Sequence, residues 1–349
     1  MAEPFLLIRA DATHRMGAGH VMRSLAVAQA WRDGFGQVAF VCADIAPSLS
    51  EQLADENIET IHISSAAGSA EDALDLLAIA EDKQAAALIL DGYQFLSEYQ
   101  KIVTDFDGVT MAIDDFGNFG CYMTDFVLNQ NLGADANLYA DRMDHTELLL
   151  GTKYALIRRE FLVTGKCQRE PGRLASRILV TLGGSDPDNR TAVIIKGLQQ
   201  LDRSELKVHV IVGAMNQHYE ELVRQLGTDE RFLLLRSVRD MATEYLWADI
   251  AVAAGGSSNW EMCYFGLPRL VVVIADNQRD IAEQLQRAHV AINLGEASQL
   301  VPEHVTEAAE LLLADQARRD RARECGRYIV DGKGALRCVH RLLNLSASI

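Results

Sequence analysis

The sequence predicts an α/β protein made of two doubly wound parallel sheets, one in each half of the chain. Apolar runs of strand length alternate with amphipathic helical stretches along both halves, and this alternation is typical of parallel sheets covered by helices. The length of 349 residues exceeds what one core usually supports and suits two domains. We expect ligands to bind in the cleft between these domains.

Changes in composition suggest the domain boundaries. We expect an N-terminal Rossmann-like domain over residues 1–160, a polar, turn-forming linker over 161–175 and a C-terminal Rossmann-like domain over 176–330. A helical tail over 331–349 follows, and it could either cross back onto the first domain or form a short appendage.

The elements follow from the apolar patterns, taken in chain order. In the first half we expect strands at 4–9, 37–42, 58–63, 85–90, 109–113, 125–128 and 147–150, with helices at 19–33 and 71–82. In the second half we expect strands at 177–182, 207–212, 231–235, 248–253 and 269–274. Its helices are expected at 188–200, 217–226, 239–246, 258–265, 277–288, 304–314, 316–330 and 334–345.

Charge and hydropathy exclude several classes of partner. The net charge of −16 argues against nucleic acid, because neutralising phosphates needs a basic surface. No apolar run approaches the roughly 20 residues of a membrane helix. Arg9 and Asp11 interrupt the apolar run near the N-terminus, so we expect no signal peptide, no membrane partner and a cytoplasmic protein. No motif encodes an oligomeric state, and a monomer is the simplest expectation.

We expect neither a metal nor a cofactor. The six cysteines are scattered and form no Cys-x-x-Cys pair, so a zinc site and a disulfide framework are both disfavoured. Two stretches match the Asp-x-Asp pattern of metal-dependent transferases. We interpret 105–107 as a turn and 186–188 as a helix cap.

A glycine loop joins the first expected strand to the first expected helix. Gly17 and Gly19 precede His20, without the spacing of a dinucleotide fingerprint or of a phosphate-binding P-loop. Glycines let backbone N–H groups approach a ligand, and a helix N-terminus favours an anion. A histidine here can act on whatever is bound. The alternative interpretation is a tight turn with a capping histidine.

Polar residues follow three later strands of the first half, where parallel sheets bind ligands. Asp91 and Tyr93 follow one strand, Asp114 and Asp115 the next, and the run 129–131 the third. Turn chemistry explains Asp114 and the start of 129–131 as well as a functional role does. Tyr93 can offer its hydroxyl group to a ligand.

Two glycine-rich loops in the second half join a strand to a helix N-terminus, the arrangement that binds a diphosphate. The first loop contains Gly184 and Ser185, which we expect to contact the substrate. The second spans 253–261 and ends at Glu261, one turn into the following helix. A carboxylate beside an anion site suits the two hydroxyls of a ribose. The alternative role for Glu261 is favourable charge at a helix N-terminus.

The stretch from Val238 to Pro268 resembles the donor-binding region of GT-B nucleotide-sugar enzymes, with the N-acetylglucosaminyltransferase of peptidoglycan synthesis as a cousin. The resemblance implies a GT-B fold and a UDP site. In that site the backbone near Val238 meets the uracil and Glu261 the ribose. The implied diphosphate ligands are Gly255, Gly256, Ser257 and Ser258, and the implied sugar ligands are Asn277 and Gln278.

The first half resembles one branch of these enzymes, the UDP-2,4-diacetamido-2,4,6-trideoxy-β-L-altropyranose hydrolases of pseudaminic acid synthesis, together with related spore-coat polysaccharide proteins. The motifs are Arg9 to Asp11, Gly17 to Arg23, Asp91 with Tyr93, 114–115, 129–131 and 150–161. The resemblance implies that His20 is catalytic and that Arg9 contacts the substrate. The basic run 13–16 departs from the family pattern and bears on substrate fit.

These residues suggest hydrolysis of a UDP-sugar with release of UDP and inversion at the anomeric carbon. A nucleoside diphosphate leaves without an acid, so one base that deprotonates water suffices. We assign that role to His20, expect Asp11 to orient it, and expect Tyr93 to bond the water or an N-acetyl group. A GT-B glycosyltransferase that activates an acceptor hydroxyl is the main alternative, and a non-catalytic nucleotide-sugar-binding regulator is the third.

Overall fold

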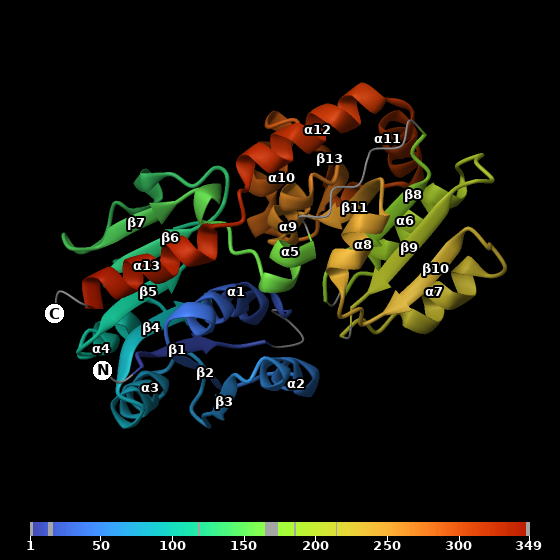
Figure 1. Cartoon of the computed structure of the whole chain (residues 1–349). Coiled ribbons are helices and arrows are strands. Elements are labelled where there is room, and N and C mark those ends of the chain that lie inside the picture. The colour runs from blue at the N-terminus through green and yellow to red at the C-terminus, as the bar shows by residue number, and fades with distance from the viewer. Residues whose placement is uncertain are drawn as a thin grey trace. The chain divides into compact units, whose positions relative to one another are not determined.

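The computed structural model describes residues 3–12, 17–117, 119–164, 174–184, 186–213 and 215–346. The chain divides into two compact units (Figure 1). The first unit comprises Met1–Arg159 together with Gly332–Ile349, and the second comprises Glu160–Asp331.

The first unit contains a seven-stranded parallel sheet with the order β3-β2-β1-β4-β5-β6-β7. Its strands are β1 (Phe5–Ala10), β2 (Gln37–Cys42), β3 (Glu59–His62), β4 (Ala85–Asp91), β5 (Val109–Ile113), β6 (Phe126–Asn129) and β7 (Glu147–Leu150). Its helices are α1 (Gly19–Gly34), α2 (Pro47–Asp55), α3 (Ala70–Asp82), α4 (Ser97–Val103) and α13 (Gly334–Ser346).

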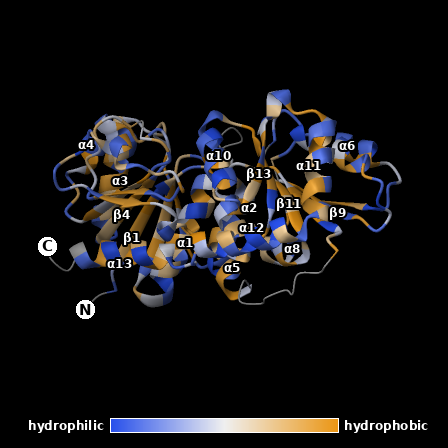
Figure 2. Ribbon diagram, turned by 90° about the horizontal axis from the view of Figure 1, so that it is seen from above, coloured by the Kyte–Doolittle hydropathy of each residue, from blue (hydrophilic) through white to orange (hydrophobic). Residues whose placement is uncertain are grey.

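Helices cover both faces of this sheet because both faces are apolar. Side chains alternate between the faces along each strand. Leu6 and Ile8 of β1 therefore join one core, with α1 and α13. Leu7 joins the other, with α3 and α4. Figure 2 shows β1 and β4 as hydrophobic along their length, as expected for strands buried on both sides.

The C-terminal helix α13 is part of the first unit. It packs against α1, and its side chains Cys338, Val339 and Leu342 are fully buried in the same core as β1. At its start the chain lies against the end of the first unit's main segment. A Cβ atom on Gly334 would lie 2.2 Å from the carbonyl oxygen of Ala155, so only glycine fits there.

The second unit contains a six-stranded parallel sheet with the order β10-β9-β8-β11-β12-β13. Its strands are β8 (Arg177–Thr181), β9 (Lys207–Val212), β10 (Phe232–Arg236), β11 (Ile250–Ala254), β12 (Arg269–Val273) and β13 (Ala291–Glu296). Its helices are α6 (Arg190–Gln199), α7 (Tyr219–Leu226), α8 (Met241–Trp247), α9 (Ser258–Phe265), α10 (Arg279–Arg287), α11 (Pro302–Ala314) and α12 (Gln316–Ile329). Helix α5 (Arg159–Thr164) begins at the boundary between the units.

The α/β class with two parallel sheets, predicted from the alternating patterns, is confirmed. Four of the helices and strands described above escaped the prediction: α2, α4, α5 and the edge strand β13. In α2 only Leu53 is buried, so the helical periodicity is faint. All residues of β13 are half-buried, and the strand contains Asn293 and Gly295, which are uncommon in strands. Of the expected linker over 161–175, residues 165–173 lie outside the described residues.

Strand order reverses at one point in each sheet. In the first unit the reversal lies between β1 and β4, and in the second between β8 and β11. Loops that leave the carboxyl ends of such a strand pair run in opposite directions, and a crevice opens between them. The glycine loop before α1 and both glycine-rich loops of the second unit begin at these strands.

The buried side of α13 predicts a contrast between two leucines of that helix. Leu342→Ala removes apolar volume from the core and should lower the free energy of unfolding by about 2–5 kcal/mol. Leu336→Ala, at a side chain that is 43% exposed, is the matched control and should cost less than about 1 kcal/mol. Urea denaturation measures both, and equal effects would contradict the packing of α13.

Candidate active site

His20 occupies the first turn of α1, at the carboxyl edge of the first sheet. Its Nδ1 atom lies 2.7 Å from Oδ1 of Asp91, the last residue of β4. An ionised carboxylate only accepts hydrogen bonds, so Nδ1 of the neutral ring carries the proton and Nε2 is its basic atom. Within the described part of the chain, Nε2 makes no hydrogen bond. The side chain of His20 is otherwise almost buried.

Asp91 is a fully buried anion with three partners. The hydroxyl group of Ser24 donates to Oδ2 at 2.7 Å. Arg23 donates to Oδ2 from Nε at 2.9 Å and to Oδ1 from Nη2 at 2.6 Å. Burial acts to raise the pKa of Asp91, but the charge of Arg23 and the contact with His20 outweigh it and hold that pKa well below its usual range. The carboxylate beside His20 is therefore ionised.

A second carboxylate, Asp115, lies on the other side of Arg23. The Nη1 atom of Arg23 lies 2.8 and 2.9 Å from its two oxygens. The hydroxyl group of Tyr93 donates to Oδ2 at 2.8 Å, and Asn131 donates to Oδ1 at 3.1 Å. Against the effect of burial, Arg23 and Tyr93 lower the pKa of Asp115. The ring of Tyr93 also meets the ring of His20 edge-on, with centroids 4.7 Å apart.

The expected contact between Asp11 and His20 is not made. The carboxylate of Asp11 accepts hydrogen bonds from the backbone N–H groups of residues 43 and 44, at 2.7 and 3.1 Å, and it is buried. The partner of His20 is Asp91, because β4 and not β2 lies on the side of β1 that faces the ring. Asp11 thus holds the end of β2 in place.

Arg9 also differs from its expected role as a substrate contact. Its side chain is fully buried, and Nε and Nη2 each donate to Asp72 of α3 at 2.8 Å. It also forms an ion pair with Asp11 at 2.8 Å. Burial acts to lower the pKa of Arg9, but these two carboxylates raise it above its usual range. Arg9 therefore stabilises the first unit from within.

Asp114 serves the turn after β5. Its Oδ2 atom accepts from the backbone of Gly117 at 2.6 Å and from the hydroxyl groups of Tyr122 and Tyr139 at 3.0 and 2.9 Å. Asn129 donates to Tyr139 at 2.8 Å and accepts from the backbone of residue 131. Both side chains are buried, and the turn-chemistry interpretation of these positions fits their contacts.

In the second unit, the loop between β8 and α6 is shaped by glycine and aspartate. Gly183 has a φ of +87°, which favours glycine. A Cβ atom on Gly213, after β9, would lie 2.3 Å from the carbonyl oxygen of Gly184, so the two loops touch. Ser185 lies outside the described residues. Asp186 accepts from the backbone of residues 190 and 191, as the helix-cap interpretation of 186–188 predicts.

The loop between β11 and α9 is fixed by side-chain amides. Gln278 accepts from the backbone N–H of Gly255 at 3.0 Å, and a Cβ atom on Gly255 would lie 2.9 Å from its Cβ. The side-chain carbonyl of Gln278 therefore binds the loop, and the predicted contact with a sugar falls to its amide nitrogen. Asn277 lies beside it, in the 3₁₀ turn Asp276–Gln278.

Two residues that the sequence analysis missed complete this support. Asn259 donates to the carbonyl oxygens of residues 254 and 256, each at 2.8 Å, and accepts from Nε of Arg269 at 2.7 Å. Both side chains are almost fully buried. These hydrogen bonds fix the loop backbone directly before α9. The first backbone N–H groups of a helix have no acceptor within that helix. Gly256, Ser257 and Ser258 lie at this helix start.

Glu261 lies one turn into α9, where its carboxylate accepts from the hydroxyl group of Tyr245 at 2.9 Å. Tyr245 is held in turn by stacking on Phe161, with ring centroids 5.6 Å apart. Val238 follows β10 on the same carboxyl edge of the sheet as the loop before Glu261. The residues expected to bind UDP therefore share one edge of the second sheet.

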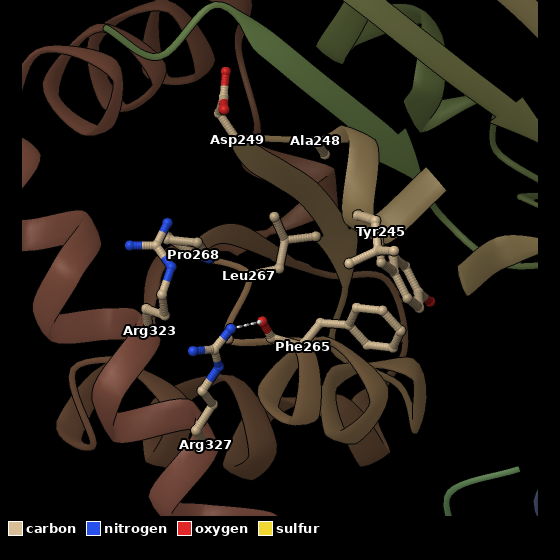
Figure 3. Close-up of a pocket in the computed structure, with 10 residues that line it drawn as sticks. Tyr245, Ala248, Asp249, Phe265, Leu267, Pro268, Arg323 and Arg327 are labelled. Carbon is tan, nitrogen blue, oxygen red and sulfur yellow. Dashed lines mark hydrogen bonds between the residues drawn. The ribbon is translucent and has the colours of Figure 1, made fainter. Parts of the chain in front are cut away.

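A pocket of the second unit lies at the opposite edge (Figure 3). Asp249 precedes β11 and Pro268 precedes β12, so the pocket meets the amino ends of these strands. Arg323 and Arg327 of α12 line it, and Arg327 donates to the carbonyl oxygen of Phe265 at 3.4 Å. These arginines meet the C-terminal end of α9, which cations stabilise. The pocket is separate from the glycine-rich loops.

Comparisons with known proteins address both units. Residues 177–327 match the model of the glycosyltransferase family 28 C-terminal domain. An uncharacterized protein of Methanocaldococcus jannaschii is 22% identical over 82% of this chain and 60% of its own length. The spore coat polysaccharide biosynthesis protein SpsG of Bacillus subtilis is 26% identical over 70% and 72%, respectively. The UDP-2,4-diacetamido-2,4,6-trideoxy-beta-L-altropyranose hydrolase of Campylobacter jejuni is 27% identical over 55% and 65%.

The chain thus spans less than two thirds of the length of the first and third of these relatives. Among solved structures, MurG of Acinetobacter baumannii has a TM-score of 0.66 at 15% identity, over 98% of this chain and 99% of its own. The structure of Staphylococcus aureus MnaA with UDP has a TM-score of 0.70 at 12% identity, over 99% and 98%. The chain has the GT-B fold.

Across the described ranges, no group of three or more His, Cys, Asp or Glu side chains is arranged to hold a metal ion. No helix in those ranges combines the length and the apolar character needed to cross a bilayer.

The buried ion pair of Arg9 predicts a loss of stability and not of ligand affinity. Arg9→Met leaves the buried carboxylate of Asp72 without its cation, and should lower the free energy of unfolding by about 3–5 kcal/mol. Lys83→Met breaks the exposed pair with Glu59 and, as the control, should cost less than about 1 kcal/mol. Urea denaturation and UDP binding measure the two effects. Weaker UDP binding by Arg9→Met at unchanged stability would instead support a direct contact between Arg9 and the substrate.

Proposed function

We propose that this protein hydrolyses a UDP-activated diacetamido-trideoxy sugar at its anomeric carbon, releasing UDP and the free sugar, as a step of pseudaminic acid biosynthesis. The observation that carries the proposal is the pair of His20 and Asp91, with 2.7 Å between Nδ1 and Oδ1. It leaves Nε2 as a base in a ring whose tautomer is set. The similarity to the Campylobacter jejuni hydrolase supports the choice of sugar.

The second unit supplies the site for the leaving group. UDP departs as an anion, so donors that hold its charge replace the acid that an ordinary glycosidase needs. The start of α9, with Gly256, Ser257 and Ser258, offers backbone N–H groups to the diphosphate. Glu261 accepts from the ribose hydroxyls, and Tyr245 orients its carboxylate. The likeness to a solved UDP-bound structure of the same fold supports this assignment.

The chemical step then needs one water and one base. The water oxygen forms a bond to the anomeric carbon as the bond from that carbon to the diphosphate oxygen breaks. The bonding electrons leave with UDP, and His20 accepts the proton of the water at Nε2. Attack from the face opposite UDP inverts the configuration. The other charged side chains of the site, Asp91, Arg23 and Asp115, keep their charges throughout the step.

A glycosyltransferase is the second candidate. The match to a glycosyltransferase family 28 domain over residues 177–327 and the likeness to MurG favour it. The same base would then deprotonate an acceptor hydroxyl instead of water. The two candidates share the UDP site and differ only in the nucleophile.

The role of His20 predicts the outcome of one substitution. His20→Asn should reduce turnover by about 100- to 10,000-fold, because the general base is lost, and should leave UDP affinity unchanged. His145→Asn, at an exposed histidine before β7, is the control and should keep full activity. The measurement is incorporation of ¹⁸O from labelled water into the released sugar, without an acceptor, with the first anomer identified by NMR.

Three results would contradict this assignment. Full activity in His20→Asn would show that His20 is not the general base. UDP release only after an alcohol acceptor is added would favour the transferase. Absence of UDP release under every condition, with tight binding retained, would favour a binding protein.

Glu261 predicts a specific loss of ribose recognition. Glu261→Gln should weaken UDP binding about tenfold, the cost of one hydrogen bond to a charged group. The wild-type protein should lose a similar factor with 2′-deoxy-UDP, whereas the variant should bind UDP and 2′-deoxy-UDP almost equally. Glu283→Gln, on the exposed face of α10, is the control. Calorimetric titration measures all four affinities, and equal discrimination by both proteins would place the ribose elsewhere.

A further inference from the structure

Arg23 connects two carboxylates that hold two different side chains of the site. Its Nη2 and Nε atoms bind Asp91, and its Nη1 atom binds both oxygens of Asp115. Asp91 in turn binds His20, and Asp115 binds the hydroxyl group of Tyr93. The rings of these last two residues touch edge-on. The five side chains therefore form a closed circuit of contacts.

We propose that Arg23 and Asp115 are positioning residues, which set the tautomer, the orientation and the proton affinity of His20 for the reaction proposed above. The inference rests on that proposed function for its kinetic consequence only. Its structural content, the state of one imidazole ring, can be measured without any substrate.

The tautomer follows from the position of the charges. In water a neutral histidine side chain carries its proton mostly on Nε2, which would leave no base facing the solvent. Here Asp91 accepts from Nδ1, and Asp91 stays ionised because Arg23 lies 2.6 Å from it. Nη2 of Arg23 also lies 3.2 Å from Nδ1 of His20. Loss of Arg23 therefore changes the anion on which the tautomer depends.

The orientation follows from Tyr93. Its hydroxyl hydrogen points to Asp115, so the ring is anchored at its far end. The edge-on contact then restricts rotation of the imidazole about its own axis. The hydroxyl hydrogen of Tyr93 is thus used inside the site, so the predicted hydrogen bond with the water or an N-acetyl group falls to the hydroxyl oxygen as acceptor. Asp115 acts on His20 through Tyr93 as well as through Arg23.

The charges that face the ring have opposite effects on its protonation. These charges are the anions Asp91 and Asp115 and the cation Arg23, and the uncharged ring of Tyr93 also faces the imidazole. Removing the cation favours the protonated imidazole, which is inactive as a base. Removing the anion of Asp115 leaves Arg23 less compensated and favours the neutral ring. The two substitutions should therefore shift the acidic limb of activity in opposite directions.

The first test is the ¹⁵N NMR spectrum of the full chain labelled at its nine histidines. His20→Asn identifies the signals of His20 by their loss. The wild-type ring should show a protonated Nδ1 and an unprotonated Nε2 at neutral pH. In Arg23→Gln the doubly protonated ring should become populated at neutral pH, whereas Arg23→Lys, which keeps the charge, should retain more of the neutral Nδ1–H form. An unchanged protonation state of the ring in Arg23→Gln overturns the proposal.

The second test is the pH profile of kcat/KM for UDP release. Arg23→Gln should move the acidic limb up by about one pH unit, because it removes a cation next to the ring, and Asp115→Asn should move it down by a similar amount, because it removes an anion. Tyr93→Phe should lower kcat without moving the limb. A merely structural role would lower activity in all three without shifts of opposite sign, and that result also overturns the proposal.

Matched controls remove the same charges elsewhere. Arg32→Gln lies near the other end of α1, and Asp107→Asn lies at the exposed residue just before β5, opposite the Asp115 end of that strand. Neither should move the limb, and a shift in either would count against a local effect.

Should His20→Asn keep full turnover, the proposed function fails while the NMR result stands. Should only the limb shifts be absent, the positioning role fails and the proposed function stands.

Discussion

The ionised carboxylate of Asp91 is the constraint on which the first unit's site depends. It lies with no exposed surface at the end of β4, beside the reversal of strand order. An anion removed from water costs several kcal/mol unless cations and donors surround it. Arg23, Ser24 and His20 supply them, and all three come from the first two turns of α1. Side chains from one helix, α1, therefore offset the cost of burying Asp91 at the end of β4. These side chains and Asp91 form the polar cluster around His20.

The second unit supports its loop without a carboxylate. Asn259 and Gln278 hold the backbone before α9 by amide hydrogen bonds, and the charged side chain behind Asn259, Arg269, is a cation. This difference has a physical reason. A carboxylate that anchored the loop from the side of its N–H groups would repel the diphosphate proposed to bind there. The one acidic side chain of α9's first turn, Glu261, is turned to Tyr245.

The sequence predicted the architecture well because both sheets are parallel and buried on both faces, which produces long apolar runs. It also predicted which strand ends carry polar residues. It could not predict which of those ends become neighbours. Asp11 is nearer to His20 along the chain, yet Asp91 is its partner, because the order of β2, β1 and β4 in the sheet is set by packing.

The sequence also could not predict which polar side chains are buried. Arg9 and Arg23 are both arginines near the end of β1 or the start of α1, and nothing in their local pattern separates them. In the structure the first meets Asp72 behind the sheet and the second meets Asp91 at its edge. Asn259 and Arg269 escaped notice for the same reason, since an asparagine after a glycine-serine run is read as turn chemistry.

The return of α13 to the first unit has a consequence for biosynthesis. The second unit is one uninterrupted segment, Glu160–Asp331, whereas the first is assembled from both ends of the polypeptide. On the ribosome the part of α1 that packs on α13 stays uncovered until α13 has emerged. The usual order, in which the N-terminal part matures earliest, is thereby inverted. The second unit can finish folding while the first unit still lacks α13.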